Sequence, residues 1–159
     1  MLFEVESRSA ADTFRIGEAL GRLLEPGDVL GLSGDLGAGK TELVRGLARG
    51  LDIDPDVIYS PSFTLVAEHE GRLRLNHIDL FRLGEPVSLQ EEEEIGLTDY
   101  LSPSGVTAVE WHRKLRARAG AWTLEVEIAL GEGDRRSLRL EGEGPRAAAI
   151  LGVLERSWR

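Results

Sequence analysis

A glycine-rich segment in the first third of the chain carries the residue pattern with the clearest chemistry. Its spacing is G-x-x-x-x-G-K-T, with a third glycine inside it. Glycines allow backbone conformations in which successive N–H groups point at phosphate oxygens, while lysine supplies a cation and threonine offers a hydroxyl to Mg²⁺. The pattern predicts a loop that binds a nucleoside triphosphate, made of Gly34, Asp35, Leu36, Gly37, Ala38, Gly39, Lys40 and Thr41.

Two carboxylates stand where a magnesium-dependent phosphate site needs them. Asp79 ends the segment 75–79, and Glu110 ends the apolar segment 106–110. Because parallel strands bring their C-terminal ends to the same edge of a sheet, both carboxylates are expected beside the glycine-rich loop. We predict that the catalytic residues are Lys40, Asp79 and Glu110 and that the metal ligands are Thr41 and Glu110.

Other candidates are tied less closely to a pattern. The loop Ser60-Pro61-Ser62-Phe63-Thr64 is rich in hydroxyl groups, and Thr64 is a candidate ligand of the γ-phosphate or of Mg²⁺. The alternative is an ordinary turn before a strand over 63–66. For Trp111 the alternatives are a place in the core or in an interface and stacking on a nucleotide. A basic cluster is a solvated helix, a group that stabilises phosphate or a contact with an anionic partner, and it consists of Arg113, Lys114, Arg116 and Arg118.

The hydrophobic pattern predicts the elements that hold these residues in place. Helices are expected over 9–24 and 40–51, with buried strands over 29–32 and 106–109. The remaining expected elements are strands over 72–80 and 122–130, a returning strand through Leu138 and Leu140, a capped helix from Ser88 and a helix from Pro145. This order predicts an α/β fold of the P-loop NTPase type. It has a mostly parallel sheet flanked by helices and a late antiparallel hairpin, in a single domain over 1–159.

Composition narrows the possible functions further. The 19 basic and 28 acidic residues give a net charge of −9, so the chain is a poor candidate for holding RNA or DNA alone, although it can serve a nucleic-acid pathway through a protein partner. The absence of cysteine excludes disulfides and thiolate chemistry. The first residues do not resemble a signal peptide, and no stretch approaches the ~18 apolar residues of a membrane span. We expect a cytoplasmic protein. The three histidines have no metal-ligand spacing.

Taken in order, the motifs resemble the TsaE (YjeE) family. The resemblance rests on the segments 34–41, 60–66, 78–83 and 109–111. It implies a magnesium-dependent ATPase required for N6-threonylcarbamoyladenosine (t6A), the modified base at position 37 of tRNAs that read codons beginning with A. The family acts with the proteins TsaB and TsaD, so contact with tRNA is expected to be indirect.

The resemblance also implies roles for individual residues. Lys40 and Thr41 hold the phosphates and Mg²⁺, and Trp111 matches the family's tryptophan. Asp79 matches the Walker-B-like aspartate of the family, and Glu110 its second metal-side carboxylate. The adenine is expected between Ala10 and Arg135. The chain departs from the family pattern at Glu42, which helix geometry is expected to point to solvent, and at His112, which stands where proline is frequent.

Three other functions remain open at the level of the sequence. A small-molecule kinase needs an acceptor pocket and an arginine lid, for which 113–118 is the candidate segment. A regulatory GTPase is disfavoured because the chain has no N-K-x-D guanine motif. A nucleotide-gated binding module with negligible hydrolysis uses the same residues as an ATPase, so the sequence does not separate these two.

Overall fold

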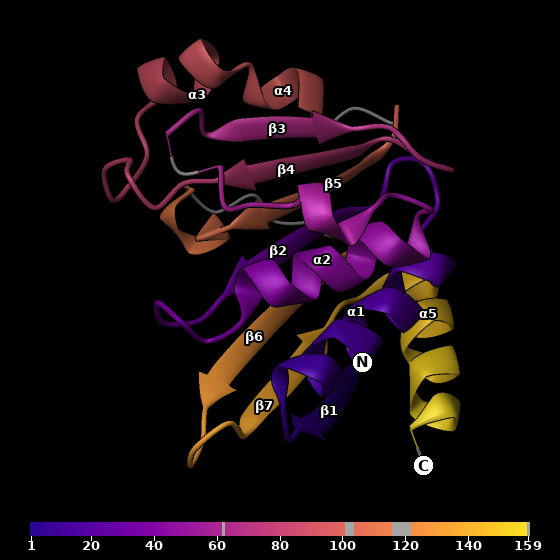
Figure 1. The fold of residues 1–159 in the computed structure, drawn as a ribbon. Helices are drawn as coiled ribbons and strands as arrows, with labels where there is room; N and C mark the ends of the chain where they lie inside the picture. Colours follow the sequence, from indigo (N-terminus) through magenta and orange to yellow (C-terminus); the bar gives the residue numbers. More distant parts are fainter. Residues whose placement is uncertain (62, 101–103, 116–121, 159) are drawn as a thin grey trace.

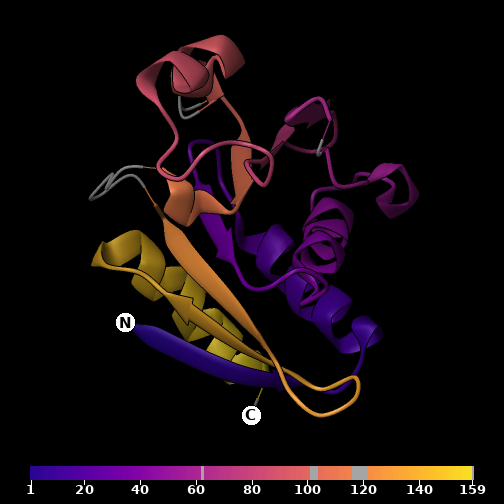
Figure 2. The same cartoon turned by 90° about the vertical axis from the view of Figure 1, so that its left-hand side faces the viewer.

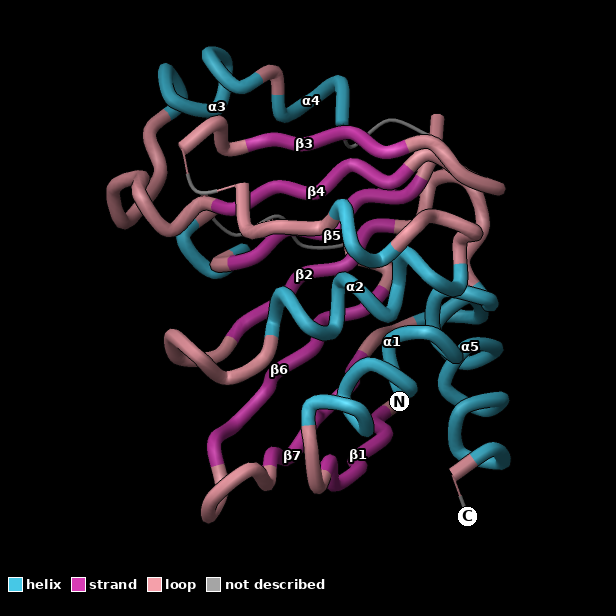
Figure 3. The backbone as a smooth tube through the Cα atoms, in the orientation of Figure 1, coloured by secondary structure: helices cyan, strands magenta, loops and turns pink. Residues whose placement is uncertain are grey.

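One mixed β-sheet forms the centre of the molecule in a computed structural model that describes residues 1–61, 63–100, 104–115 and 122–158. Within those residues, seven strands pair in the order β1-β7-β6-β2-β5-β4-β3, and Figure 3 shows them following one another in this order. The strands are β1 (Leu2–Ser7), β2 (Val29–Ser33), β3 (Val66–His69), β4 (Leu75–Asp79), β5 (Val106–Glu110), β6 (Leu124–Leu130) and β7 (Arg136–Glu141).

The middle of the sheet is parallel and its two sides are antiparallel. Strand β2 pairs in parallel with β5 and with β6, and β5 pairs in parallel with β4. Every residue of β2, β4 and β5 is buried, as expected of parallel strands covered on both faces. The antiparallel pairs are β1–β7, β6–β7 and β3–β4. The predicted α/β fold with a parallel core and a late β6–β7 hairpin is therefore confirmed.

Three helices, α1 (Ala10–Leu23), α2 (Lys40–Gly50) and α5 (Gly144–Ser157), share the larger hydrophobic core with the sheet. Figure 1 shows α1 and α2 crossing in front of the strands, with α5 beside α1. The first two helices approach closely because small residues line their contact. A Cβ atom on Gly17 would lie 2.3 Å from the Leu43 carbonyl oxygen, and one on Gly46 would lie 2.1 Å from that of Phe14. This tight pair fixes the start of α2, where the glycine-rich loop ends.

A second, smaller core covers the other face of β4 and β5. It contains Ile78 and Val109, which alternate with the buried carboxylates Asp79 and Glu110, together with Leu97. Figure 2 shows α3 and α4 set apart from α1 and α2, with strands between them. The helices on this side are α3 (Leu89–Ile95), α4 (Leu97–Tyr100) and the short 3₁₀ turn η2 (His112–Lys114), and a further 3₁₀ turn, η1 (Pro55–Val57), follows α2.

Both predicted helix starts that rest on a serine cap are confirmed. The Ser9 hydroxyl accepts a hydrogen bond from Asp12 N at 3.1 Å. Ser88 and Glu91 form a complete capping box at the start of α3. The side-chain hydrogen bonds satisfy N–H groups that have no partner inside the helix, which is why these residues mark the first turn.

Two of the expected strands begin later than the sequence pattern indicated. Residues 63–65 form a turn, with Leu65 at φ +67°, so the strand predicted over 63–66 begins at Val66 and runs to His69 instead. A positive φ breaks the extended path of the chain. The strand predicted over 72–80 begins at Leu75. In addition, β1 (Leu2–Ser7) was not predicted, although it pairs with β7 along its whole length.

Candidate functional site

The glycine-rich loop joins the end of β2 to the start of α2, and its backbone has the conformation that the pattern requires. Gly34, Gly37 and Gly39 have φ values of +148°, +77° and +113°, a region that residues with a side chain rarely enter. At Gly34 there is also no space, because a Cβ atom would lie 2.5 Å from the Ile128 carbonyl oxygen. The loop ends at the N-terminus of an eleven-residue helix. The free N–H groups at such a helix end favour the binding of anions.

Lys40 lies inside this loop. Its ammonium group donates hydrogen bonds to the carbonyl oxygens of Gly34 and, at 3.0 Å, of Asp35. The same nitrogen lies 4.3 Å from the ring centre of Trp111. Burial lowers the pKa of Lys40 from its ordinary value, while the carboxylates of Glu110, Asp79 and Asp35 act in the opposite direction. The loop thus holds a nearly buried amine that has carboxylates on one side and an aromatic ring beside it.

The two predicted carboxylates meet at this loop. Asp79 and Glu110 are paired residues in the parallel ladder between β4 and β5, so their side chains leave the same face of the sheet. Each residue is 3% exposed. The Thr41 hydroxyl donates to Glu110, with Oγ1 3.3 Å from Oε2. Asp79 accepts from Phe81 N at 2.9 Å and from the Ser60 hydroxyl at 2.5 Å. Both carboxylates are therefore held in fixed orientations.

A cavity of about 400 Å³ opens where these groups meet. It brings together eight of the predicted residues, namely Leu36, Gly37, Gly39, Lys40 and Thr41 of the loop region and Asp79, Glu110 and Trp111. Residues that were not predicted complete its lining, namely Glu42, Arg45, Ser60, Phe81 and Arg82.

The donor set of the cavity fits magnesium bound together with phosphates. No group of three or more His, Asp or Glu side chains converges as a metal site in the part of the chain that the structure describes. Magnesium bound with a nucleotide needs no such cage, because it takes one or two protein oxygens and the remainder from phosphates and water. The Thr41 hydroxyl and the Glu110 carboxylate supply oxygens of that kind.

Thr64 is not brought to this cavity. It lines a different one with Leu65, Val66 and Tyr100, and its hydroxyl donates to the Val66 carbonyl oxygen at 3.3 Å. Ser62, from the same predicted loop, lies outside the described residues. Among the described residues of that hydroxyl-rich loop, Ser60 is the one that contacts Asp79.

The two residues expected to flank an adenine lie near the end of β1. Ala10 is the first residue of α1, and Arg135 stands in the β6–β7 turn, where it pairs with Glu6 at 2.6 Å. The next residue, Arg136, donates to the Ala38 carbonyl oxygen at 3.1 Å. The hairpin therefore contacts the phosphate loop directly.

The two residues of the basic cluster that the structure describes both contact other parts of the protein. Arg113 pairs with Glu127 at 2.8 Å, and Lys114 donates to the carbonyl oxygens of Phe81 at 2.7 Å and Leu83 at 3.0 Å. Arg116 and Arg118 lie outside the described residues. The two described residues of this cluster therefore bind groups of the protein itself, namely a glutamate of β6 and two backbone carbonyl oxygens.

The structure shows the contacts of Glu42 and His112, the two residues that depart from the family pattern. Glu42 lines the cavity and pairs with Arg45 at 3.0 Å, so the expectation that it points away to solvent is wrong. His112 packs its ring over Gly31, where a Cβ atom would lie 2.4 Å from Cδ2. Its Nε2 lies 2.7 Å from Glu125 Oε1. A histidine is accommodated after Trp111 because β2 has no side chain at Gly31.

A contact between two buried side chains of the site was not predicted. His77 Nε2 lies 2.5 Å from Glu110 Oε2, and both side chains are buried. The H-x-D spacing on one strand indicates that His77 shares a face with Asp79, while its contact with Glu110 depends on the pairing of β4 with β5.

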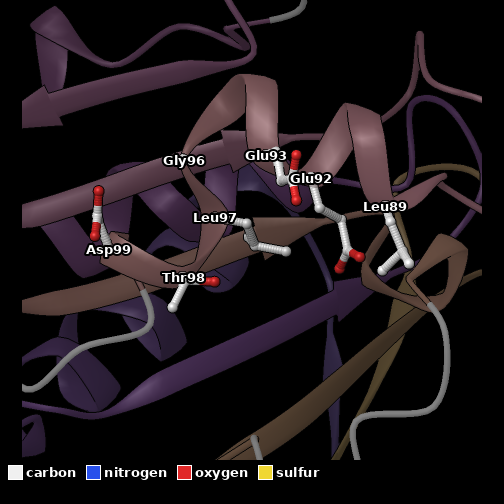
Figure 4. Close-up of a pocket in the computed structure, with 7 residues that line it drawn as sticks. All are labelled: Leu89, Glu92, Glu93, Gly96, Leu97, Thr98 and Asp99. Atoms are coloured by element: carbon white, nitrogen blue, oxygen red, sulfur yellow. The ribbon is translucent and has the colours of Figure 1, made fainter.

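A separate cavity of about 370 Å³ lies at α3 and α4 (Figure 4) and contains none of the predicted site residues. Figure 4 shows the side chains of Glu92 and Glu93 on α3 and of Leu97, Thr98 and Asp99 on the following segment. It has no basic side chain in its lining, so it does not resemble a phosphate site. The phosphate chemistry of the described chain therefore centres on the glycine-rich loop.

Comparison with known proteins agrees with this geometry. Residues 7–138 match the family described as Threonylcarbamoyl adenosine biosynthesis protein TsaE. The chain belongs to the TsaE family. It is 42% identical over 130 residues to the tRNA threonylcarbamoyladenosine biosynthesis protein TsaE of Treponema pallidum, covering 81% of this chain and 93% of that protein. It is 34% identical to the Bacillus subtilis protein of the same name, covering 91% and 89%.

A solved structure extends the likeness to the whole fold. The crystal structure of Bacillus subtilis YdiB superposes with a TM-score of 0.77 at 28% sequence identity, covering 99% of this chain and 96% of that one. The mixed sheet with its parallel core is therefore the TsaE fold. Among the residues that the structure describes, no helix combines the length and the apolar character needed to cross a bilayer.

Proposed function

We propose that the chain binds ATP with magnesium in the phosphate-loop cavity and hydrolyses it. The observation that carries the proposal is the convergence of a buried lysine, a threonine hydroxyl and two buried carboxylates on one glycine-rich loop. Each group matches a need of phosphoryl transfer, namely charge neutralisation, metal ligation and orientation of water. Membership of the TsaE family supports the same assignment.

Each residue of the cavity would have its own role in binding ATP and magnesium. Phosphate oxygens would replace the carbonyl oxygens of Gly34 and Asp35 as partners of the Lys40 ammonium. Thr41 and Glu110 would hold magnesium, which supplies charge neutralisation at the phosphates when it is bound. Asp79, fixed by Ser60 and the Phe81 N–H group, would orient the water around the metal.

We further propose that this ATPase serves t6A modification of tRNA in the cytoplasm as a subunit acting with TsaB and TsaD. The names of the related proteins support the pathway. The net charge of −9 favours a protein partner over direct contact with tRNA. The mouth of the cavity supports a protein partner as well, because Leu36 and Phe81 line it and are 65% and 41% exposed.

The kinase alternative finds less support in the described residues. An arginine lid needs guanidinium groups free to reach phosphate, and Arg113 is paired with Glu127. Two assays distinguish the kinase from the ATPase. A phosphorylated small product, formed when the chain is mixed with ATP and candidate acceptors, supports the kinase. Phosphate release that TsaB and TsaD stimulate supports the ATPase.

Two substitutions test the proposed ATPase. Lys40→Ala is expected to weaken ATP binding at least tenfold in calorimetry, because it removes a charge-assisted contact with phosphate. Glu110→Ala is expected to lower kcat about 100-fold or more with TsaB and TsaD present while changing ATP affinity little. Normal hydrolysis by Glu110→Ala would remove its assigned role. Multiple-turnover tRNA modification with and without the wild-type chain tests the pathway assignment.

A further inference from the structure

We propose that His77 is a positioning residue that fixes the Glu110 carboxylate for ATP hydrolysis, an inference that rests on the proposed function. Neither sequence pattern nor family resemblance gave this histidine a role. It stands in the middle of β4, and its residue is 0% exposed. It does not line the cavity and therefore acts through Glu110.

Strand register explains why the two side chains meet. His77 is paired with Ala108 in the ladder between β4 and β5, and Glu110 lies two residues beyond Ala108 on the same face. Alanine leaves space in front of the imidazole, so the ring reaches along the strand to the carboxylate. The result is a contact of 2.5 Å between His77 Nε2 and Glu110 Oε2.

The chemistry of the pair fixes the direction of the hydrogen bond. An ionised carboxylate only accepts hydrogen bonds, so the imidazole donates through Nε2 and carries its proton there. His77 Nδ1 has no hydrogen-bond partner among the described residues. The hydrogen bond that the imidazole makes among the described residues therefore goes to Glu110, and histidine and carboxylate groups around metal sites commonly pair in this way.

The hydrogen bond from His77 helps to fix the orientation of the Glu110 carboxylate. Its Oε2 is shared between His77 at 2.5 Å and the Thr41 hydroxyl at 3.3 Å, while Oε1 makes the longer contact of 3.5 Å with Thr41. Without the imidazole, the longer contact with the Thr41 hydroxyl is the side-chain hydrogen bond that remains to the carboxylate among the described residues, so its orientation is less strictly fixed. A rotated carboxylate no longer presents its oxygens to magnesium and water in one arrangement.

Two substitutions of His77 separate positioning from packing. His77→Leu removes the donor and fills the site with an apolar side chain, whereas His77→Gln keeps an N–H donor near the position of Nε2. We expect His77→Leu to lower kcat for ATP hydrolysis with TsaB and TsaD about 10–100-fold while the KM for ATP with magnesium changes little. We expect His77→Gln to recover most of this loss. Equal impairment of both variants, or full activity of His77→Leu, overturns the proposal.

His69→Leu is the matched control. His69 lies on the neighbouring strand β3, is half-buried, and has no described contact with Glu110. Burial lowers its pKa, with a smaller contribution from His77. We expect this variant to hydrolyse ATP as the wild type does. A loss as large as that of His77→Leu shows that the effect does not depend on the contact with Glu110 and overturns the proposal.

A spectroscopic measurement judges the pair independently of hydrolysis. In nitrogen NMR of the histidine-labelled full chain, His77 is expected to be protonated at Nε2, and Glu110→Gln is expected to move that signal. Unchanged His77 signals in Glu110→Gln overturn the proposal. Absence of hydrolysis by the wild type with its partners would instead contradict the proposed function. The spectrum would then still show whether His77 binds the Glu110 carboxylate.

Discussion

The glycines of the phosphate loop differ in what surrounds them, and this difference predicts unequal effects of the same substitution. Gly34→Ala places a Cβ atom 2.5 Å from the Ile128 carbonyl oxygen at φ +148°, so the start of the loop must move. Gly37→Ala meets nothing within 4 Å at φ +77° and costs about 1–2 kcal/mol of backbone strain. We expect Gly34→Ala to weaken ATP binding at least tenfold more than Gly37→Ala in calorimetry. Equal affinities would contradict this ranking.

Residues that form one continuous motif were predictable, and contacts between distant segments were not. Lys40 and Thr41 follow from a local spacing that dictates a local backbone shape. The bond between Ser60 and Asp79, like that between His77 and Glu110, depends on which strands are neighbours and in what register. A single sequence does not contain that information, because a shift of one residue turns every side chain to the other face.

The ion pair between Asp28 and Arg146 joins three segments at the end of β2 that lies away from the phosphate loop. Asp28 precedes β2, and Arg146 of α5 contacts its carboxylate at 2.6 Å and the Leu23 carbonyl oxygen at the end of α1 at 2.5 Å. The hydrogen bond to Asp28 raises the pKa of Arg146. Because Arg146→Ala leaves a buried carboxylate without its cation, we expect a loss of about 2 kcal/mol, or roughly 4–8 °C in Tm.

Arg139→Ala is the control for this loss. Arg139 and Glu141 are 3.9 Å apart, and both side chains are more than half exposed, at 53% and 57%. Exposed pairs contribute at most about 1 kcal/mol and frequently less. Thermal unfolding of the two variants under the same conditions makes the comparison. A Tm for Arg146→Ala equal to that of Arg139→Ala would show that the Asp28 pair does not join these elements.

Elements with strong local signals were predicted, and those that depend on distant partners were missed or misplaced. The serine caps of α1 and α3 act within one turn, so their positions could be predicted. Strand β1 alternates Phe3 and Val5 with glutamates, yet six residues at the start of a chain carry little weight until β7 is known to pair with them. The start of β3 depends on the positive φ of Leu65, which its residue type does not reveal.

The molecule as a whole combines a net charge of −9 with exposed apolar side chains, some of which lie at or beside the phosphate-loop cavity. Beside Leu36 and Phe81 at the cavity, Tyr59 is 69% and Phe63 is 84% exposed. Tyr59 precedes Ser60, which lines the cavity, and the Phe63 ring lies 4.2 Å from the guanidinium carbon of Arg82, which also lines it. Aromatic side chains exposed in this number favour a protein interface over open solvent. The opening is therefore the expected contact with partners.

Phe63→Ser tests this view of the molecule. Loss of a central aromatic side chain from an interface costs about 2 kcal/mol, or roughly thirtyfold in affinity. We expect half-maximal stimulation of ATP hydrolysis to need correspondingly more TsaB and TsaD, while ATP affinity of the free chain stays unchanged. Leu89→Ser is the matched control, because Leu89 is 67% exposed but lines the separate cavity at α3. Equal partner dependence of the two variants would place the interface elsewhere.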